Sequence, residues 1–374
     1  MRILVLGGTG AIGTFLVEKL ISEGHEVFVT SRVQRDYVGK STNKTVYILG
    51  DAHCNIFLNN LLEDSWDAIV DFMVYGEEEF KNRYDILLKN TKQYVFLSSS
   101  RIYANSDSPI TENSDRLLDI CSDINYLKTS EYALLKARQE DLLLSSQYKN
   151  WTVIRPYITY SEERLQLGGY EKEHWLYRAL DNRTIVFSSN IAKSITTMTY
   201  GYDVANCIAM LIGNKKAYTQ MIQITGSQNM TWGSILEIYL DAIEKKTGIR
   251  PKVCMIDDES ILEKIMGNRF QIHYDRMYNR IFDSKKLCDI CDREIEYTSM
   301  ESGLGQCLRS FIDSERNFKE ISWAIEGCLD QMTGETTLLQ NIPSFRQKIK
   351  YLIARYMPLR LLIIINIFIK KSAS

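Results

Sequence analysis

The stretch GGTGAIG, residues 7–13, constrains the fold of this chain more than any other feature. It lies between a wholly apolar run, Ile3–Leu6, and the segment Ala11–Ser22, whose apolar residues recur at helical spacing. This context predicts a strand, a tight turn and a helix. Such a loop leaves backbone N–H groups uncovered at a helix N-terminus, which is a site for the pyrophosphate of a dinucleotide.

Each glycine of the loop has an expected task. Gly7 permits the sharp turn, Gly10 lets the backbone approach the phosphates, and Gly13 lets the helix pack closely against the strand. The spacing is GxxGxxG rather than GxGxxG, a variant suited to the same task. The alternative is a helix start with incidental glycines. The loop residues predicted to contact the cofactor are Gly7, Thr9, Gly10, Ala11, Ile12 and Gly13.

Short apolar runs continue along the first half of the chain and predict an α/β fold. Continuous apolar strands are typical of a parallel sheet that helices cover on both faces. We therefore expect a Rossmann-type doubly wound parallel sheet with a smaller C-terminal substrate lobe. The expected strands are His25–Thr30, Val46–Leu49, Ala68–Phe72, Tyr94–Leu97, Trp151–Ile154 and Lys252–Ile256, and the expected helices are Leu127–Gln147, Val204–Ile212 and Trp232–Lys246.

The pattern also predicts a domain division. Residues 1–156 form the dinucleotide-binding domain, with later segments returning to it, and residues 157–325 form mainly the substrate-binding lobe. Residues 343–374 are a basic and apolar tail.

Composition excludes several classes of protein. The net charge of -2 gives no global attraction to nucleic acid. The first residues lack the pattern of a secretory signal, so we expect a cytoplasmic protein with reduced thiols. Cys288 and Cys291 form one CxxC pair without a second, and the four histidines make no ligand pattern, so no metal is predicted.

Two positions bear on the choice of cofactor. An acidic residue after the second strand would select NAD, but this chain has Thr30, Ser31 and Arg32 there. Arg32, with Arg35 as a spare, favours NADP over NAD by pairing with a 2'-phosphate, although both could be solvated arginines. Asp51 is placed to contact the adenine; alternatively, it stabilises the turn after the third strand.

Tyr132 and Lys136 lie four residues apart on one helical stretch and are candidates for proton transfer. A cation beside a tyrosine stabilises the phenolate, so the pair could take a proton from a sugar hydroxyl while a nicotinamide takes the hydride. The serines of FLSSSRIY follow a strand at the carboxyl edge of the sheet, where one can orient the reacting oxygen. A helix cap is the alternative for these serines.

In order and spacing, GGTGAIG, LGD, SSSRIY, YALLK with Glu140, IRPYITY and YGYDVA resemble the extended short-chain dehydrogenase/reductase family of NAD-dependent epimerase/dehydratases that act on nucleotide sugars. The likeness covers roughly residues 1–320. It implies that Ser99 and Tyr132 are catalytic and that Lys136 lowers the pKa of the tyrosine and holds the nicotinamide ribose. It also implies that Pro156, with Arg155 and Tyr157, passes beside the nicotinamide, and that the protein is a homodimer.

Departures from this family limit the reaction and the substrate contacts. Sugar dehydratases carry Asp-Glu where this chain has Ser100 and Arg101, so a 4,6-dehydratase is not expected, and these two residues become candidate substrate contacts. Thr196 stands where the family has an arginine for the substrate diphosphate. Lys193 is the candidate substitute, with Arg164 and Arg183 as alternatives. Phe72, Met73 and Val74 replace small residues, so a narrower pocket is expected.

The tail lies beyond the usual end of family members. Its apolar run Leu361–Ile369 is too short to cross a bilayer, and Arg360, Lys370 and Lys371 flank it. Peripheral membrane contact, packing against the body or a second subunit, and disorder are the alternatives.

The sequence therefore predicts an NAD(P)-dependent nucleotide-sugar epimerase that acts at C4 through a transient keto sugar. One alternative is an NADPH-dependent reductase of a keto nucleotide sugar, which Arg32 favours. A second is a non-catalytic dinucleotide-binding sensor or nucleic-acid scaffold, against which the set Ser99, Tyr132 and Lys136 argues.

Overall fold

The protein is represented by a computed structural model that describes residues 1–33, 45–314, 318–358 and 361–362. Arg35 therefore lies outside the described residues. The chain divides into two compact units, each built from three separate stretches. The first unit comprises Met1–Ser161, Thr197–Asn229 and Arg280–Met300, and the second comprises Glu162–Thr196, Met230–Asn279 and Glu301–Ser374.

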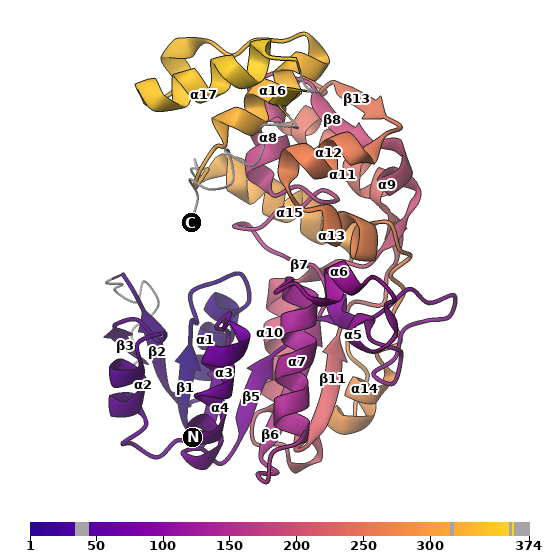
Figure 1. The fold of residues 1–374 in the computed structure, drawn as a ribbon. Coiled ribbons are helices and arrows are strands. Elements are labelled where there is room, and N and C mark those ends of the chain that lie inside the picture. The colour runs from indigo at the N-terminus through magenta and orange to yellow at the C-terminus, as the bar shows by residue number, and fades with distance from the viewer. Residues whose placement is uncertain (34–44, 315–317, 359–360, 363–374) are drawn as a thin grey trace. The chain divides into compact units, whose positions relative to one another are not determined.

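The first unit is built around a seven-stranded sheet in the order β11-β6-β5-β4-β1-β2-β3 (Figure 1). All neighbouring strands are parallel, which confirms the predicted Rossmann-type sheet. The strand order reverses between β1 and β4, and ligands of such sheets bind at this switch point, beyond the carboxyl ends of the strands. The strands are β1 (Arg2–Leu6), β2 (Glu26–Ser31), β3 (Thr45–Leu49), β4 (Ala68–Asp71), β5 (Tyr94–Leu97), β6 (Trp151–Pro156) and β11 (Gln220–Ile224).

Helices cover both faces of this sheet because its central strands are apolar on both sides. Ile3 and Val5 of β1 belong to one hydrophobic cluster, with α1 and α10. Leu4 and Leu6 of the same strand belong to the other, with α2, α3, α4 and α7. The helices of the unit are α1 (Gly13–Ser22), α2 (Asn55–Leu61), α3 (Glu77–Lys81), α4 (Tyr84–Lys89), α5 (Leu117–Ile120), α6 (Ile124–Leu127), α7 (Tyr132–Leu144), α10 (Gly201–Leu211) and α14 (Lys285–Cys291), and the short strands β7 (Thr159–Tyr160) and β10 (Thr199–Tyr200) pair with each other.

The helix predicted over Leu127–Gln147 is corrected by the structure, in which α6 ends at Leu127 and α7 begins only at Tyr132. Asp123 caps α6, which ends at Leu127. The side chain of Glu131 then accepts the backbone N–H of Ala133 and starts α7 at Tyr132. The new start places Tyr132 in the first turn of its helix, where a side chain is less enclosed by its own helix than in the middle.

The second unit is mainly helical and contains two small two-stranded sheets, β8 with β13 and β9 with β12. The strand expected at Lys252–Ile256 is present as β13. The elements are α8 (Lys172–Leu180), β8 (Ile185–Ser188), α9 (Ser189–Lys193), β9 (Ile195–Thr196), β12 (Met230–Thr231), α11 (Trp232–Thr247), β13 (Val253–Ile256), α12 (Glu259–Met266), α13 (Arg269–Gln271), α15 (Met300–Asp313), α16 (Trp323–Thr333) and α17 (Phe345–Tyr356).

The last two helices form a hairpin, which Figure 1 shows in yellow. Gly327 of α16 lets the helices meet closely, since a Cβ there would lie 2.6 Å from the carbonyl oxygen of Tyr351. Ser344 caps the start of α17, and Gln331 donates to the carbonyls of Arg355 and Met357 at its end. Of the predicted apolar run Leu361–Ile369, only Leu361 and Leu362 lie within the described residues.

Candidate active site

The glycine loop has the local geometry that its sequence predicts at two of its three key positions. Gly7 has a φ of +71°, which favours glycine. A Cβ on Gly10 would meet no atom within 4 Å, so the space beside this residue is open. A Cβ on Gly13 would lie 2.6 Å from the carbonyl carbon of Gly8. Gly13 thus permits the close packing of α1 against the loop itself rather than against a strand.

The loop is held from two sides. The backbone N–H of Gly7 donates to the hydroxyl of Thr30 at the end of β2, at 3.0 Å. Gly201, the first residue of α10, has no space for a Cβ because the carbonyl oxygen of Ala11 lies against it. The glycine of YGYDVA therefore has a packing role that its sequence motif alone did not reveal.

The residues expected near the adenosine lie at the carboxyl ends of β2 and β3. Arg32 follows β2 directly and is exposed. Asp51 follows β3, and its carboxylate accepts the backbone N–H of His53 at 3.0 Å. This bond is the turn role that the sequence left open for Asp51, and it does not exclude contact with an adenine.

A buried ion pair joins the segments that carry the catalytic candidates. Glu140 of α7 receives two hydrogen bonds from the guanidinium of Arg155 on β6, at 2.8 and 2.7 Å. Glu140 also accepts a hydrogen bond from the hydroxyl of Ser98, at 2.5 Å. Arg155 donates a further hydrogen bond to the hydroxyl of Tyr103. These bonds hold the end of β5, α7 and β6 together.

Lys136 occupies an unusual position within this framework. Its ammonium lies 4.5 Å from the ring centroid of Phe96 and 5.9 Å from that of Tyr132. The residue is 1% exposed, and within the described part of the chain its Nζ has no hydrogen-bond partner. Burial lowers the pKa of Lys136 to about 8, which the carboxylates of Asp71 and Glu140 oppose.

Asp71 is a functional candidate that the sequence analysis missed. It ends β4 and is fully buried, where it accepts the hydroxyls of Tyr75 at 2.9 Å and Tyr94 at 2.7 Å. Burial raises its pKa, and the two tyrosines and the Lys136 charge oppose the shift. A carboxylate at the end of the apolar run AIVDF was the available signal.

The serines after β5 have different surroundings. Ser99 is buried and its hydroxyl accepts the backbone N–H of Arg101, at 3.2 Å. Ser99 thus also serves as the cap that was the alternative for this segment. Ser100 is fully buried, and its hydroxyl donates to the carbonyl of Arg155 at 2.7 Å. A direct substrate contact of Ser100 would have to replace this bond.

Arg101 lies close to Tyr132. Its guanidinium pairs with Glu131 at 2.5 Å and lies 5.4 Å from the ring centroid of Tyr132. Tyr132 therefore has the cation of Arg101 near its ring as well as that of Lys136. Glu131, which the sequence analysis did not single out, holds Arg101 and starts α7.

The candidates for the substrate diphosphate lie in the second unit. Lys193 is exposed at the end of α9. Thr196 is fully buried, and its hydroxyl has no partner within the described residues. Arg164 is exposed near Glu171, whereas Arg183 is buried in ion pairs with Asp181 and with two carboxylates of α16. Among these alternatives, Arg183 already has a structural role.

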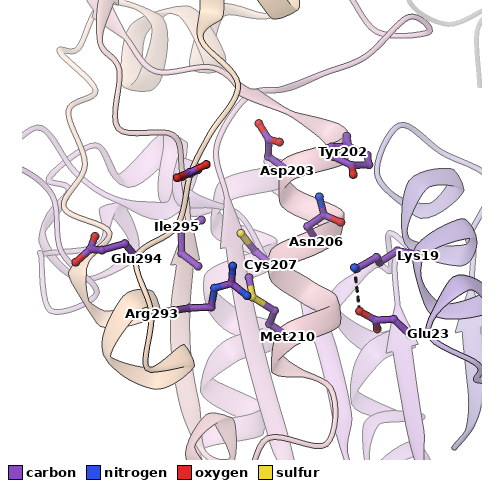
Figure 2. A pocket seen from close by; sticks show the side chains of 11 residues that line it. Lys19, Glu23, Tyr202, Asp203, Asn206, Cys207, Met210, Arg293, Glu294 and Ile295 are labelled. Carbon is purple, nitrogen blue, oxygen red and sulfur yellow. Dashed lines mark ion pairs between the residues drawn. The ribbon is translucent and has the colours of Figure 1, made fainter.

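A separate pocket of about 400 Å³ lies on the first unit, between α1, α10 and the segment after α14. Figure 2 shows the ion pair of Lys19 with Glu23 on one side of the pocket, and the side chains of Arg293 and Glu294 on the other side. Asp203 lines it, but its carboxylate accepts the backbone N–H of Thr298 at 2.8 Å and fastens the returning chain. None of the predicted site residues lines this pocket.

The residues present fit a dinucleotide. Open space beside Gly10 leaves room for phosphates at the start of α1, and the positive end of that helix favours them. The buried ammonium of Lys136 lacks a partner that ribose hydroxyls would supply. Both features lie in the unit that holds the parallel sheet.

Comparisons with known proteins agree with this fold. Residues 3–224 match the model of the NAD dependent epimerase/dehydratase family. The chain is 26% identical over 247 residues to the chloroplast stem-loop binding protein of 41 kDa b from Arabidopsis thaliana, a match that covers 63% of this chain and 61% of that protein. It is 24% identical over 341 residues to UDP-N-acetyl-alpha-D-glucosaminuronate decarboxylase from Bacillus cytotoxicus, covering 84% of this chain and 99% of the relative.

A solved structure shows the same fold. UDP-glucuronic acid 4-epimerase from Bacillus cereus, in complex with UDP-glucuronic acid and NAD, superposes with a TM-score of 0.61 at 16% identity, covering 84% of this chain and all of that one. The family match spans more than half of the chain and includes the glycine loop, the serine segment and α7. The chain therefore belongs to the NAD-dependent epimerase/dehydratase family.

Proposed function

We propose that this protein is a nucleotide-sugar epimerase that acts at C4 through a transient keto sugar. The observation that carries the proposal is the buried ammonium of Lys136, without a hydrogen-bond partner in the described chain, beside the ring of Tyr132. A buried cation without a partner is costly, so its retention indicates a role that the free protein does not fulfil. The relatives named above include a UDP-sugar decarboxylase and a UDP-sugar 4-epimerase, which supports a nucleotide sugar as substrate.

In the proposed mechanism, Tyr132 removes the proton from the sugar hydroxyl. The ammonium of Lys136 stabilises the phenolate and would hold the ribose hydroxyls of the cofactor. The hydroxyl of Ser99 would donate to the reacting oxygen of the sugar and orient it. A bound nicotinamide would supply hydride acceptance and return. In an epimerase, the chain must also leave room for the keto sugar to turn before it is reduced.

The cofactor contacts are proposed for the glycine loop, Arg32, Asp51, Lys136 and Pro156. We favour NADP over NAD, because Arg32 is exposed at the end of β2 and can meet a 2'-phosphate. Exchange of Arg32 for Ala should then raise the dissociation constant for NADP more than the dissociation constant for NAD. An equal effect on both would remove the argument for NADP.

Two variants test the dinucleotide site and the chemistry separately. Gly10→Ala adds a methyl group that no protein atom contacts, so the fold should persist while dinucleotide affinity falls at least about 10-fold. Tyr132→Phe should retain the dinucleotide and lose turnover by about 10²–10⁴-fold. Unchanged turnover in Tyr132→Phe would exclude the tyrosine as the acid/base.

The reaction type can be read from redox balance. An epimerase retains its cofactor and shows no net redox change, whereas the alternative, a reductase of a keto nucleotide sugar, consumes NADPH steadily. Mass spectrometry of the copurifying nucleotide, followed by screening of nucleotide sugars for exchange or reduction, distinguishes the two. Lys193 is the proposed contact for the substrate diphosphate, and Arg101 for the sugar.

A nucleic-acid-binding scaffold is the second candidate, favoured by the similarity to the Arabidopsis stem-loop binding protein. The net charge of -2 opposes it. Stem-loop RNA binding at physiological salt, together with no turnover of any nucleotide sugar, would replace the enzyme proposal. We also propose a homodimer, which light scattering of the purified protein tests.

A further inference from the structure

The C-terminal helix α17 has two faces with different surroundings. Tyr351 and Ala354 are buried against α16, where Tyr351 donates to Asp330 at 2.7 Å. The opposite face is apolar but exposed: the exposed fractions are 79% for Phe345, 41% for Ile349, 46% for Ile353 and 64% for Tyr356. The packing of the hairpin therefore leaves a row of large apolar side chains in solvent.

These four residues form one stripe. At about 100° per residue, Phe345, Ile349, Ile353 and Tyr356 lie within an arc of about 80°. We call this row the α17 stripe. Isolated exposed apolar residues are common, but a continuous row along a helix marks a contact surface.

Basic residues border the α17 stripe on both sides. Arg346 and Lys350 follow one edge of the arc, and Lys348 and Arg355 follow the other. From residue 336 to the C-terminus the sequence has seven Lys and Arg residues and no Asp or Glu. The charged residues of α17 and of the sequence after it are thus all basic, although the whole chain is nearly neutral.

From this arrangement we infer that α17 binds the surface of a membrane that contains anionic lipids. Interfacial helices place an apolar stripe at the level of the acyl chains and flanking Lys and Arg at the headgroups. A second copy of the chain fits less well, because a twofold contact through the stripe would bring the same basic borders together. None of the helices that the structure describes is long and apolar enough to cross a bilayer.

Sedimentation of the full chain with vesicles tests this inference. Vesicles of phosphatidylcholine mixed with phosphatidylglycerol should bind the protein, and pure phosphatidylcholine should bind it at least about 10-fold more weakly. The triple variant Phe345→Ser, Ile349→Ser, Ile353→Ser should lose at least about 100-fold in affinity. Exchange of Lys348 and Lys350 for Gln should lose about 10-fold or more, since each cation near the surface contributes about a fivefold factor.

The matched control is Ile249→Ser, an isoleucine of the second unit outside α17 that is 53% exposed, slightly more than Ile349 and Ile353. It should bind anionic vesicles as the unchanged protein does. Circular dichroism identifies any variant that fails to fold, and such a variant is replaced by the single change Phe345→Ser, the most exposed position. Absence of binding to both vesicles overturns the inference, as does equal binding by the stripe variant. Self-association that the stripe variant loses, without vesicle binding, assigns the stripe to a subunit contact instead.

Discussion

Each unit contains a buried network of ion pairs, and the two networks differ in balance. In the first unit a single carboxylate, Glu140, accepts two hydrogen bonds from Arg155 and a third from Ser98. In the second unit Arg178 and Arg183 of the α8–β8 region face Glu326 and Asp330 of α16. One oxygen of Glu326 has no hydrogen-bond partner within the described residues.

The two buried acids of the second network differ in the direction of their pKa shifts. Burial raises the pKa of Glu326 to about 7, against the opposing effect of the two arginines. The pKa of Asp330 is lowered, because the two arginines and the hydroxyl of Tyr351 outweigh its burial. The first network holds the end of β5, α7 and β6 together beside the candidate site. The second network holds the C-terminal hairpin in place, and in it Glu326 is poorly stabilised as an anion.

The largest expected effect is in the first network. Arg155→Met leaves the buried carboxylate of Glu140 without a close cation, because its remaining ion-pair partner, Arg116, lies 3.8 Å away, so the free energy of unfolding should fall by about 3–5 kcal/mol. Urea unfolding measures the loss. The double variant Arg155→Met, Glu140→Gln should recover part of it; a double variant less stable than the single one would contradict the assignment of the cost to the unpaired charge.

Loss of one arginine from the second network should lower the free energy of unfolding by a smaller amount. After Arg178→Met, Arg183 still contacts both Glu326 and Asp330, so we expect a loss of about 2–3 kcal/mol in the second unit. Hydrogen exchange should report faster opening of α16 and α17 but not of the parallel sheet. Equal acceleration in both units would show that the networks are coupled.

Much of the first unit could be predicted from sequence, and much of the second could not. The strands β1, β2, β4, β5 and β6 are apolar runs that local patterns reveal. The hairpin of α16 and α17 depends on Arg178 meeting Asp330, 152 residues later, which no local pattern reveals. In the candidate site, Tyr132 and Lys136 share a helix and were predicted from their spacing, whereas the environment of the buried Asp71 depends on Tyr94 from a neighbouring strand, which no local pattern reveals.

The stability of the second network should depend on pH. The folded-state pKa of Glu326, about 7, lies above the usual value of about 4.5, so stability falls as the pH rises from about 4.5 to about 7. Between about pH 5 and about pH 8, the unchanged protein should lose about 1–3 kcal/mol relative to Glu326→Gln.

The control for this pH dependence is Glu335→Gln. The pKa of Glu335 is lowered, mainly because Thr184 donates to its carboxylate against the effect of burial. Its contribution is present above the unfolded pKa and is lost as the pH falls through the folded value. The two variants should therefore differ in the sign of their pH dependence; equal signs would refute the assignment.

Lys136 extends the comparison to a residue of the candidate active site. Because its folded pKa of about 8 lies below the unfolded value, its burial cost is fully present below about pH 8 and disappears as the pH approaches about 10.5. Lys136→Met should thus gain about 1–3 kcal/mol of stability at neutral pH while losing turnover. Thermal unfolding and activity are measured on the same preparation. A less stable and fully active variant would contradict both expectations.

The smallest effect is expected at Arg101. Arg101→Gln removes one of the two cations near Tyr132 and should reduce kcat about 3- to 10-fold, more at low pH than at high pH, with little change in stability. Arg138→Gln, on the same helix, is the matched control and should leave kcat unchanged. A pH-independent loss would give Arg101 a role in substrate binding rather than in proton transfer.

Two late pieces of the chain complete the first unit: the edge strand β11 and the segment Arg280–Met300. During synthesis the ribosome releases the first six strands of the sheet long before these pieces. Until about residue 224 has emerged, the edge of β6 lacks its parallel neighbour β11 and offers unpaired backbone groups. A nascent chain stalled before β11 should therefore recruit chaperones more strongly than one stalled beyond α14.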